Sequence, residues 1–488
     1  MLEVKSPQEK QSLCFRNLDG LVSCDDGDRV YEHCDLFVED GRISKIGKVE
    51  QRADVEIDGR GLIVYPGLIN THHHLYQILT RNLPQVQNLE LFDWLTKLYE
   101  IWAKLNAEGF FAACRAGMGE LIKFGCTTVF DHHYVFPENS GDLLAAEVEA
   151  ADLMGIRLVL SRGSMDFSRK DGGLPPDSVV QSLTEILKDS EALIDRYHDE
   201  KPFSMLQVVL APCSPFSVSE ELLRESAKLA RSKGVRLHTH LAETRAEEVY
   251  TQEHYGIRPL EYMSRLDWLG KDVWFAHGIH FDDAELDLLA ETGTGIAHCP
   301  ASNMKLSSGV CRVPELLKRG VPVGLAVDGS ASNDGSSLLE EMRIAYLLHR
   351  LYWGEKAPSG YELLKMATRG GAALLGRPEL GQLTVGKAAD FFAIRKRRLE
   401  LAGASFDVKN MLATVGIKAP VDFTVVNGKI LFSQGELLDV SGRLQDEVEI
   451  SRQVESASRR MQLYAVRGKL ERALEQAPVQ AVSKMVRL

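Results

Sequence analysis

The chain has 488 residues, of which 44% are hydrophobic and 26% charged, with 40 glycines and 17 prolines. This balance is typical of a soluble globular protein and excludes collagen-like, low-complexity and largely disordered classes. The 57 basic and 69 acidic side chains leave a net charge of −12, so a nucleic-acid partner is not expected. We expect a small, uncharged or weakly charged substrate instead.

We expect neither an export signal nor a membrane-spanning segment. No run approaches the roughly 18 consecutive apolar residues that a membrane helix needs. The opening MLEVKSPQEKQSLCF lacks a basic patch followed by an apolar stretch. Eight cysteines are scattered along the chain without a CxxC pair, which favours reduced thiols over disulfides or a cysteine-based zinc site. We therefore expect a cytoplasmic protein with no membrane partner.

Both ends of the chain are predicted to be β-rich. The segment DLFVEDGRISKIG alternates around Asp40-Gly41 and DFTVVNGKILF around Asn427-Gly428, and both patterns indicate hairpins. A further strand is predicted in ADFFAI, and residues 445–476 are charged with helical spacing, typical of a surface helix or an interface. We expect residues 1–65 and 378–488 to form one small, discontinuous β-sandwich domain that includes this C-terminal helix.

In residues 66–377, short apolar runs alternate with longer helical segments. Helices are predicted in EGFFAACRAGMGELIKFG and SEELLRESAKLARSKG, which both end in a glycine suited to a helix C-terminus. The apolar runs are LIVYPGLIN, CTTVFD, RLVLSR, LQVVLAP, VRLHTH, VWFAH, GTGIAH and PVGLAVD. Eight such alternations predict an α/β fold, a (β/α)8 barrel of the TIM type, with catalytic groups at the carboxyl ends of its strands.

Histidines and acidic residues gather where these strands are expected to end. Two HxH pairs occur there, and residues two apart on a strand share a face and can reach one metal ion. Capping or core roles would explain any one of these residues but not the whole set. Three neutral imidazoles and one carboxylate suit Zn²⁺ or Fe²⁺. The residues at strand ends are His72, His74, His238, His240, Glu243, His277, His280, His298 and Asp328.

The stretches PGLINTHHH, HTHLAET, FAHGIH, HCPASN and VDGSASND occur in the order typical of the amidohydrolase superfamily. The chain resembles the cytosine/guanine/triazine deaminase branch of that superfamily over nearly its whole length. This resemblance implies one divalent metal ion, zinc or else iron, bound by His72, His74, His240 and Asp328. Two-metal branches bridge their ions with a carboxylated lysine at the end of the fourth strand. Here that strand ends VVLAPCSPF, without a lysine, so a mononuclear site is expected.

The resemblance also implies roles for individual residues in catalysis and substrate binding. Glu243 corresponds to the acid that shuttles protons, and His277 to the residue that holds or deprotonates the attacking water, a role that Asp328 shares. Glu243 and His277 are also expected to contact the substrate. Gln77 lies where relatives hydrogen-bond the substrate ring, although its position also suits a polar residue at a helix start.

Longer stretches such as HHHLYQILTRNLP and GTGIAHCPASNMKLSSG are similar to those of deaminases that act on 8-oxoguanine. We therefore expect a hydrolase of carbon–nitrogen bonds in cyclic amidines that converts 8-oxoguanine to urate and ammonia. Isoxanthopterin or guanine deamination and the hydrolysis of a hydroxyatrazine-like triazine stay open, as does, more remotely, a non-catalytic scaffold. Relatives form dimers or larger assemblies, which implies a homo-oligomer.

Other residues near the predicted strand ends have two interpretations each. Trp94 and Tyr99, in ELFDWLTKLYEIW, either cover and stack on the substrate or belong to the helix core. Residues 163–178, which are polar and rich in glycine and proline, form either the pocket edge or an inert connection. His132 and His133 are candidates for substrate contact. His238 and His280 are candidates for support of neighbouring ligands.

Overall fold

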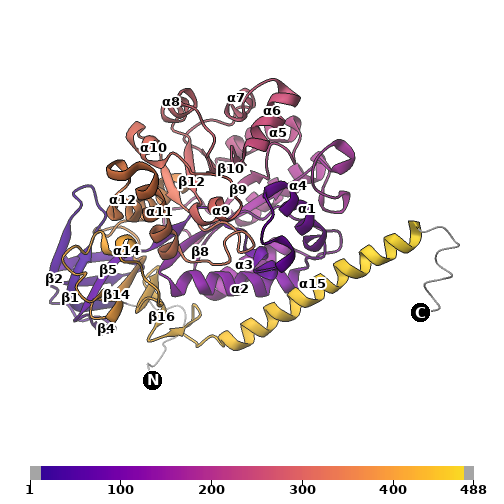
Figure 1. The fold of residues 1–488 in the computed structure, drawn as a ribbon. Helices are drawn as coiled ribbons and strands as arrows, with labels where there is room; N and C mark the ends of the chain where they lie inside the picture. Colours follow the sequence, from indigo (N-terminus) through magenta and orange to yellow (C-terminus); the bar gives the residue numbers. More distant parts are fainter. Residues whose placement is uncertain (1–11, 477–488) are drawn as a thin grey trace.

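The computed structural model describes residues 12–476, with side chains up to residue 467. It contains an eight-stranded parallel barrel and a nine-stranded mixed sheet (Figure 1). Residues 1–11, on which the expectation about an export signal depends, lie outside the described residues. Within the described range, no helix combines the length and the apolar character needed to cross a membrane.

The barrel is built from the apolar runs predicted in the middle of the chain. Neighbouring strands are parallel, in the order β13-β12-β11-β10-β9-β8-β7-β6. Thr71 N donates to Leu325 O at 3.4 Å and Asp328 N to His72 O at 3.1 Å, which joins β6 to β13 and closes the ring. The (β/α)8 prediction is therefore confirmed. The strands are β6 (Leu68–Asn70), β7 (Cys126–Asp131), β8 (Arg157–Ser164), β9 (Leu206–Pro212), β10 (Arg236–Leu241), β11 (Val273–His277), β12 (Gly295–His298) and β13 (Val323–Leu325).

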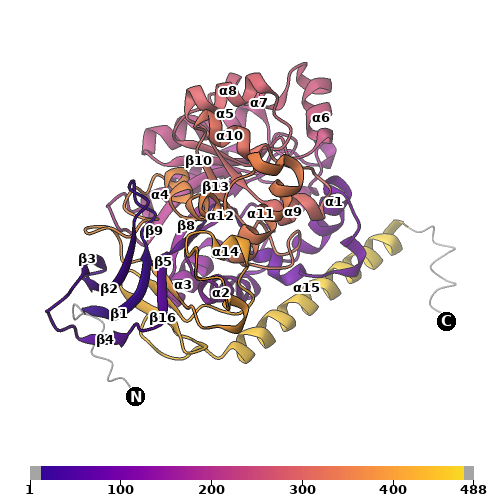
Figure 2. The ribbon, with the colours of Figure 1, turned by 60° about the vertical axis from the view of Figure 1, so that its left-hand side comes forward.

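Helices cover the outside of the barrel (Figure 2). Ser182 and Glu185 form a capping box at the start of α4, and Gly234 ends α5 in the left-handed conformation that glycine adopts without strain. The helices are α1 (Leu91–Trp102), α2 (Ala107–Lys123), α3 (Leu143–Met154), α4 (Leu183–Tyr197), α5 (Glu220–Lys233), α6 (Arg245–Tyr255), α7 (Pro259–Arg265), α8 (Asp283–Thr292), α9 (Pro300–Lys305), α10 (Val313–Arg319), α11 (Leu338–Trp353), α12 (Gly360–Lys365), α13 (Gly371–Leu375) and α14 (Met411–Thr414).

Strands from both ends of the chain form the second sheet, called here the small sheet (Figures 1 and 2). Its order is β17-β16-β15-β14-β5-β1-β2-β3, with β4 beside β1, and both predicted hairpins are present as β2–β3 and β15–β16. Phe15 packs edge-on against Phe391 and Phe423, with ring centroids 5.4 and 5.3 Å apart, so one core joins the two ends. The strands are β1 (Leu13–Val22), β2 (Val30–Glu39), β3 (Arg42–Gly47), β4 (Val55–Asp58), β5 (Leu62–Pro66), β14 (Phe391–Arg395), β15 (Phe423–Val426), β16 (Lys429–Ser433) and β17 (Glu436–Leu437).

One predicted strand is divided between the two sheets. The run LIVYPGLIN is counted as one predicted barrel strand although the predicted domain boundary, between residues 65 and 66, falls within it; its first part is β5 of the small sheet and only its second part is β6. Gly67 lies between them and donates its N–H to Asp390 O at 2.9 Å. A Cβ at Gly67 would lie 2.1 Å from Thr127 Oγ1. The chain therefore changes sheets at a residue that needs to lack a side chain.

A buried ion pair also links the barrel to the small sheet. Arg157, at the start of β8, is fully buried. Its Nε and Nη2 donate to the two carboxylate oxygens of Asp390, at 2.5 and 3.1 Å, and Nη1 donates to Phe203 O at 2.7 Å. A buried charge pair is tolerated when further hydrogen bonds satisfy its polar atoms, as they do here.

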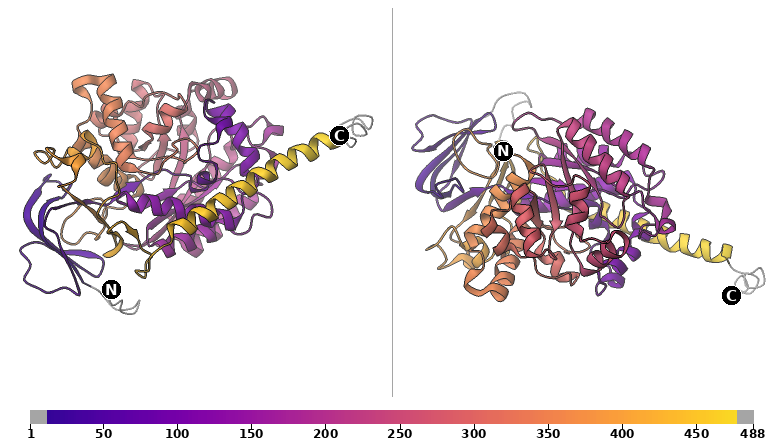
Figure 3. Two further views of the ribbon diagram at one scale, coloured as in Figure 1. Left: turned by 60° about the horizontal axis from the view of Figure 1, so that its bottom comes forward. Right: turned by 90° about the horizontal axis from the view of Figure 1, so that it is seen from above.

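Helix α15 (Glu447–Gln476) lies along α2 and extends past the body of the protein (Figures 1 and 3). Ile450 and Met461 are buried on its inner face, and Ser458 Oγ donates to Leu79 O at 2.6 Å. The prediction of a charged surface helix is confirmed, and its use as an interface stays a prediction.

Candidate metal centre and substrate pocket

The predicted site residues converge at the carboxyl end of the barrel. They follow or end strands β6, β10, β11 and β13. The first HxH pair lies just beyond β6 and not on it, yet its two rings approach each other while His73 turns away toward Ser336 Oγ at 3.2 Å. The residues brought together are His72, His74, His240, Glu243, His277 and Asp328.

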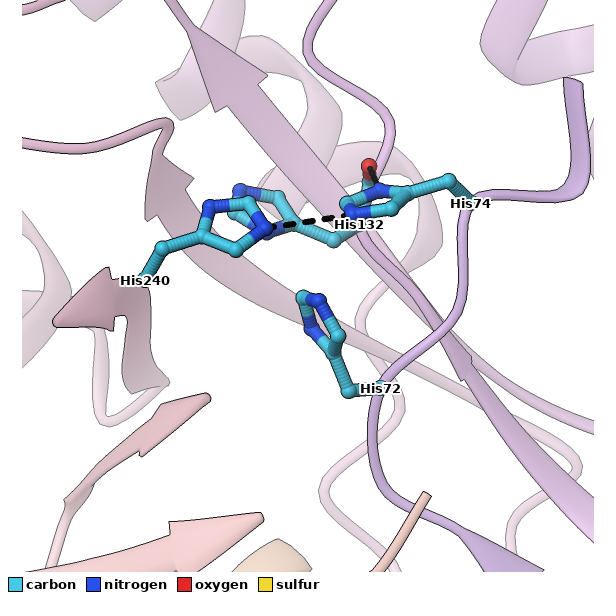
Figure 4. A group of neighbouring side chains, drawn as sticks. All are labelled: His72, His74, His132 and His240. Carbon is cyan, nitrogen blue, oxygen red and sulfur yellow. Dashed lines mark hydrogen bonds between the residues drawn. The ribbon is translucent and has the colours of Figure 1, made fainter. Parts of the chain in front are cut away.

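The four predicted metal ligands are spaced as the ligands of one ion would be, and Figure 4 draws three of them, His72, His74 and His240, with His132 beside them. Nε2 of His74 and Nε2 of His240 are 3.1 Å apart. Oδ1 of Asp328 lies 3.4 Å from Nε2 of His72 and 3.3 Å from Nε2 of His74. Ligands about 2.0–2.1 Å from a tetrahedral zinc ion are themselves separated by roughly 3.3 Å. These distances therefore match the edges of a tetrahedral metal site.

Hydrogen bonds fix the tautomer that His74 and His240 adopt as neutral rings. Nδ1 of His74 bonds to His132 O at 2.7 Å, and Nδ1 of His240 bonds to Cys213 O at 2.6 Å. A carbonyl oxygen only accepts, so each Nδ1 carries the hydrogen and each Nε2 carries a lone pair in the neutral ring. Two lone pairs thus face each other, and a cation between them would remove their repulsion.

His238 fixes the third ring in the same way. Nδ1 of His238 donates to Trp274 O at 2.9 Å, which leaves its Nε2 to accept from Nδ1 of His72 at 2.9 Å. Nε2 of His72 has no hydrogen-bond partner although the side chain is fully buried. The expectation that His238 supports a ligand agrees with this chain of bonds, which is typical of metal-binding histidines.

The charge states of His72, His240 and Asp328 suit a divalent cation. Burial lowers the pKa of His72 to about 3, and burial with the neighbouring histidines holds the pKa of His240 well below its usual range. Burial acts to raise the pKa of Asp328, but its contacts with His72 and His74 outweigh this effect and hold that pKa well below its ordinary value. Neutral imidazoles with one carboxylate form a donor set that binds a divalent metal ion.

His132 lies against the ligand rings, although its sequence position suggested at most a substrate contact. One nitrogen of His132 lies within 4.8 Å of a nitrogen of each of His72, His74 and His240. Its ring stacks on His240 with centroids 4.8 Å apart, and its Nε2 donates to Ala211 O at 2.8 Å (Figure 4). His132 therefore packs beside the ligands. The signal in the sequence that could have indicated this placement was the position of His132 at the end of β7.

Glu243 and His277 form a buried acid–base pair. Oε2 of Glu243 lies 3.5 Å from Nε2 of His277. Ser308 Oγ donates to Oε1 of Glu243 at 3.3 Å, and Nδ1 of His277 donates to Asn303 Oδ1 at 2.8 Å. Burial raises the pKa of Glu243. Burial acts to lower the pKa of His277, but Glu243 and Asp328 outweigh it and raise that pKa. The pair can therefore hold a proton between its two side chains.

Helix α9 supplies contacts that were missed in the sequence. Ser302 Oγ donates to Oδ2 of Asp328 at 2.6 Å, while Asn303 accepts from His277. Both residues lie in the HCPASN stretch that carries the family resemblance, which was the signal that they contribute to the site. This short helix therefore orients one predicted metal ligand and one member of the acid–base pair.

Three of the four predicted ligands, His74, His240 and Asp328, line one cavity together with the acid–base pair. Within the described part of the chain, neither lysine nor arginine lines it, so the cavity suits an uncharged ring better than an anion. The lining residues are His74, Gln77, Leu91, Trp94, Leu95, Tyr134, Cys213, Ser214, Phe216, His240, Glu243, His277, Leu306, Asp328 and Ser332.

Gln77 lies in this wall, where it was predicted to contact the substrate. Its side chain is 1% exposed, and its Oε1 accepts from Ala331 N at 3.4 Å. A Cβ on Gly329 would lie 1.9 Å from that oxygen. The absence of a side chain at position 329 therefore makes room for Gln77.

The predicted aromatic cover is present only in part. Trp94 lines the cavity, whereas Tyr99 packs edge-on against Trp102, with centroids 5.7 Å apart, and does not line it. Residues 163–178 contribute nothing to the lining either. Helix periodicity does not distinguish a helix face that packs on the core from one that faces a pocket.

Three other histidines have supporting or separate roles. His280 Nε2 donates to Ser308 O at 2.8 Å. His280 therefore supports Ser308, the residue that contacts Glu243, and does not support a predicted metal ligand. His298 ends β12 but faces His349, with Nε2 atoms 3.1 Å apart. His133 stacks on Phe110 with centroids 4.4 Å apart.

Comparison with known proteins agrees with this geometry. The sequence pattern of the amidohydrolase family matches residues 63–431. An 8-oxoguanine deaminase from Pseudomonas aeruginosa is 45% identical over 397 residues, which cover 80% of this chain and 88% of that protein. A hydroxydechloroatrazine ethylaminohydrolase from a Pseudomonas species is 41% identical over 90% of this chain and 94% of its own length.

A solved structure of similar fold was obtained with a metal ion. The atrazine chlorohydrolase of Arthrobacter aurescens, in complex with zinc, superposes with a TM-score of 0.87 at 32% identity. The alignment covers 91% of this chain and all of that one. The shared architecture extends over both sheets of the protein.

Proposed function

Because the chain belongs to the amidohydrolase family, we propose that it is a metal-dependent deaminase of a purine-like heterocycle, with 8-oxoguanine as its substrate. The observation that carries this proposal is the placement of Glu243 and the His/Asp cluster on one cavity without a cationic side chain. The likeness to an 8-oxoguanine deaminase supports the choice of substrate.

The proposed cofactor is one zinc ion per chain, held by His72, His74, His240 and Asp328. The tetrahedral spacing of their donor atoms and the zinc in a related structure support this choice. Iron is the alternative. When bound, such an ion acts as a Lewis acid and allows water to act as a nucleophile near neutral pH.

The proposed reaction adds water at the carbon that bears the exocyclic amine. Glu243 donates its proton to the adjacent ring nitrogen, which limits the charge that develops there. His277 and Asp328 accept or orient the proton of the attacking water. A proton returned to the amine lets the carbon–nitrogen bond break, so 8-oxoguanine and water give urate and ammonia. Gln77 is proposed to hydrogen-bond the ring.

The same residues also suit the hydrolysis of another heterocyclic ring, and similarity to one relative favours a particular second reaction. The ethylaminohydrolase relative covers more of this chain than the 8-oxoguanine deaminase does. Release of an alkylamine from a hydroxylated triazine is therefore the second candidate. Isoxanthopterin and guanine stay as further substrates, the first supported by a 37% identical isoxanthopterin deaminase.

A substrate panel tests this proposal. Purified, zinc-loaded enzyme would be given 8-oxoguanine, guanine, isoxanthopterin and a hydroxylated ethylaminotriazine, with ultraviolet detection of urate and assays for ammonia and ethylamine. The expected result is the highest kcat/KM on 8-oxoguanine. Preference for the triazine would move the assignment to the second candidate, and no turnover of any ring by metal-loaded protein would favour the non-catalytic scaffold.

The proposed setting is a cytoplasmic homo-oligomer. All eight cysteines are free and buried, which suits a reducing compartment. The outer face of α15 exposes Leu463, Tyr464 and Val466, and this supports α15 as a contact between copies. Light scattering would give the oligomeric state, and an intact oligomer after Leu463→Glu would exclude α15 as the contact.

A further inference from the structure

Glu247, in the first turn of α6, binds the backbone that carries Glu243. Its side chain is fully buried. Oε1 accepts from Ala242 N at 2.9 Å, and Oε2 accepts from Glu243 N at 3.1 Å. The two carboxylate oxygens thus accept hydrogen bonds from two consecutive backbone N–H groups, the second of which belongs to Glu243, the residue proposed to move the proton.

The peptide held by Glu247 has an unusual conformation. Ala242 has φ of 52°, in the left-handed region that residues with a Cβ rarely adopt. Its carbonyl accepts from Ile279 N at 2.9 Å and from His280 N at 3.0 Å, so the turn is also joined to the loop after β11. A backbone conformation of this kind is maintained where several interactions hold it in place together.

An ordinary helix cap does not explain these contacts. The sequence from Thr244 to Glu247 fits a capping box, in which the glutamate would accept from the N–H of the N-cap residue. Here Thr244 is the N-cap, yet Glu247 reaches past it to the two preceding peptides. By contrast, Glu185 of α4 does bond to the N–H of its own N-cap, Ser182, at 3.0 Å.

We propose that Glu247 is a positioning residue for the deaminase reaction: it fixes the left-handed turn at Ala242 and thereby aims Glu243 at the substrate ring. This inference rests on the proposed role of Glu243. With the turn held, Glu243 stands where Ser308 and His277 meet its two oxygens. Without it, the carboxyl group shifts relative to the substrate while the metal ligands keep their own supports.

Substitution of Glu247 by glutamine tests the inference. Gln has one acceptor oxygen, so its amide group would face one of the two N–H donors. Since small misplacements of catalytic groups can lower rates by about 100-fold, we expect kcat to fall by roughly 10- to 100-fold. KM and zinc content should change by less than about twofold, because an interaction lost only in the transition state lowers kcat. Glu185→Gln is the matched control and should leave kcat unchanged.

A double-mutant cycle separates positioning from general stability. Residues that act as a unit are not additive, so Glu247→Gln should change the residual turnover of a Glu243→Gln variant by less than about twofold. An equal loss in both backgrounds would overturn the inference. If the Glu243→Gln variant alone keeps wild-type turnover, the proposed function of Glu243 fails instead.

A rescue variant checks the role of the turn. Glycine adopts positive φ readily, so Ala242→Gly should restore several-fold of the turnover lost in Glu247→Gln. Failure of this rescue would contradict an effect through the turn. If the glutamine variant does not fold, Glu247→Asp, which keeps the charge but shortens the side chain, is used in the same cycle with the same expected outcomes.

Discussion

Nε2 of His74 and Nε2 of His240 lie 3.1 Å apart, and in the neutral rings neither can donate to the other. The Nδ1 of each ring is committed to a backbone carbonyl, at 2.7 and 2.6 Å. In the neutral rings the two lone pairs therefore face each other. This arrangement costs free energy that a bound cation would recover.

We expect removal of the metal to lower the stability of the protein. A ligand that binds only the folded state and is present at 1,000 times its Kd stabilises that state by about 4 kcal/mol. Calorimetry with and without a chelator, followed by zinc addition, measures the change. A Tm that does not depend on zinc would contradict a metal at this site.

The His238 support predicts a specific loss of metal affinity. His238→Ala removes the acceptor for Nδ1 of His72, so that ring loses its fixed orientation. Loss of such a support weakens metal binding by about 10- to 100-fold, which competition with a chromophoric chelator would measure. His349→Ala is the control because His349 contacts His298, outside the ligand cluster. Equal metal affinity of the His238→Ala and His349→Ala variants would contradict this supporting role of His238.

The raised pKa of Glu243 predicts the alkaline limb of the pH profile. Burial is the main cause of the shift, so the protonated form persists to higher pH than in an exposed glutamate. If that form is active, kcat/KM falls as pH rises through the raised pKa. Glu243→Gln should retain near-stoichiometric zinc, lose turnover by orders of magnitude and lack this limb. An unchanged limb in the variant would assign it to another group.

Gly329→Ala is expected to disturb substrate binding through Gln77. The added Cβ would lie 1.9 Å from Gln77 Oε1, so the amide has to move. Losing one hydrogen bond to substrate costs about 1 kcal/mol, or roughly fivefold in kcat/KM. Gly335→Ala, in the same loop, meets its nearest atom at 3.4 Å and should have little effect. Zinc analysis checks that neighbouring Asp328 still binds metal, and an unchanged kcat/KM would exclude this role for Gln77.

The link between barrel and small sheet predicts a large effect on stability. Arg157→Met leaves Asp390 buried without its partner, and breaking a buried ion pair in this way costs about 3–5 kcal/mol. The double variant Arg157→Met and Asp390→Leu should recover much of this loss, since it leaves no unpaired charge. Denaturant midpoints measure both changes. A double variant no more stable than Arg157→Met would contradict the account.

Periodicity was sufficient to predict the barrel, and motif order placed the candidate metal ligands at one end of it. Alternating strand and helix patterns specify a parallel barrel because each element buries one face. The HxH pairs drew attention to His72, His74, His238 and His240, since chemistry-bearing residues meet at one end of such a barrel, and the family resemblance selected three of these four as candidate ligands. The division of LIVYPGLIN into two strands of different sheets was not predicted, because an apolar run has the same pattern whether it lies in one sheet or in two.

Residues that support the site were harder to predict, because they act through contacts far apart in sequence. His132 and Asn303 carry no distinctive spacing of their own, and their positions depend on how β7 and α9 pack beside the ligands. Glu247 matched a common helix-capping pattern, and only the folded turn shows that its carboxylate binds earlier peptides. Such supports depend on backbone geometry, which composition and periodicity do not encode.

The single glycine between β5 and β6 limits how this enzyme can be divided. Independent modules are normally joined by exposed linkers that tolerate cutting and insertion. Here Gly67 is packed against Thr127, and the chain runs from the small sheet to His72 within a few residues. A barrel excised at this point would lose the pairing that anchors the segment carrying His72 and His74. Any transplant of this metal site to another scaffold therefore has to carry β5 and its partner β14 as well.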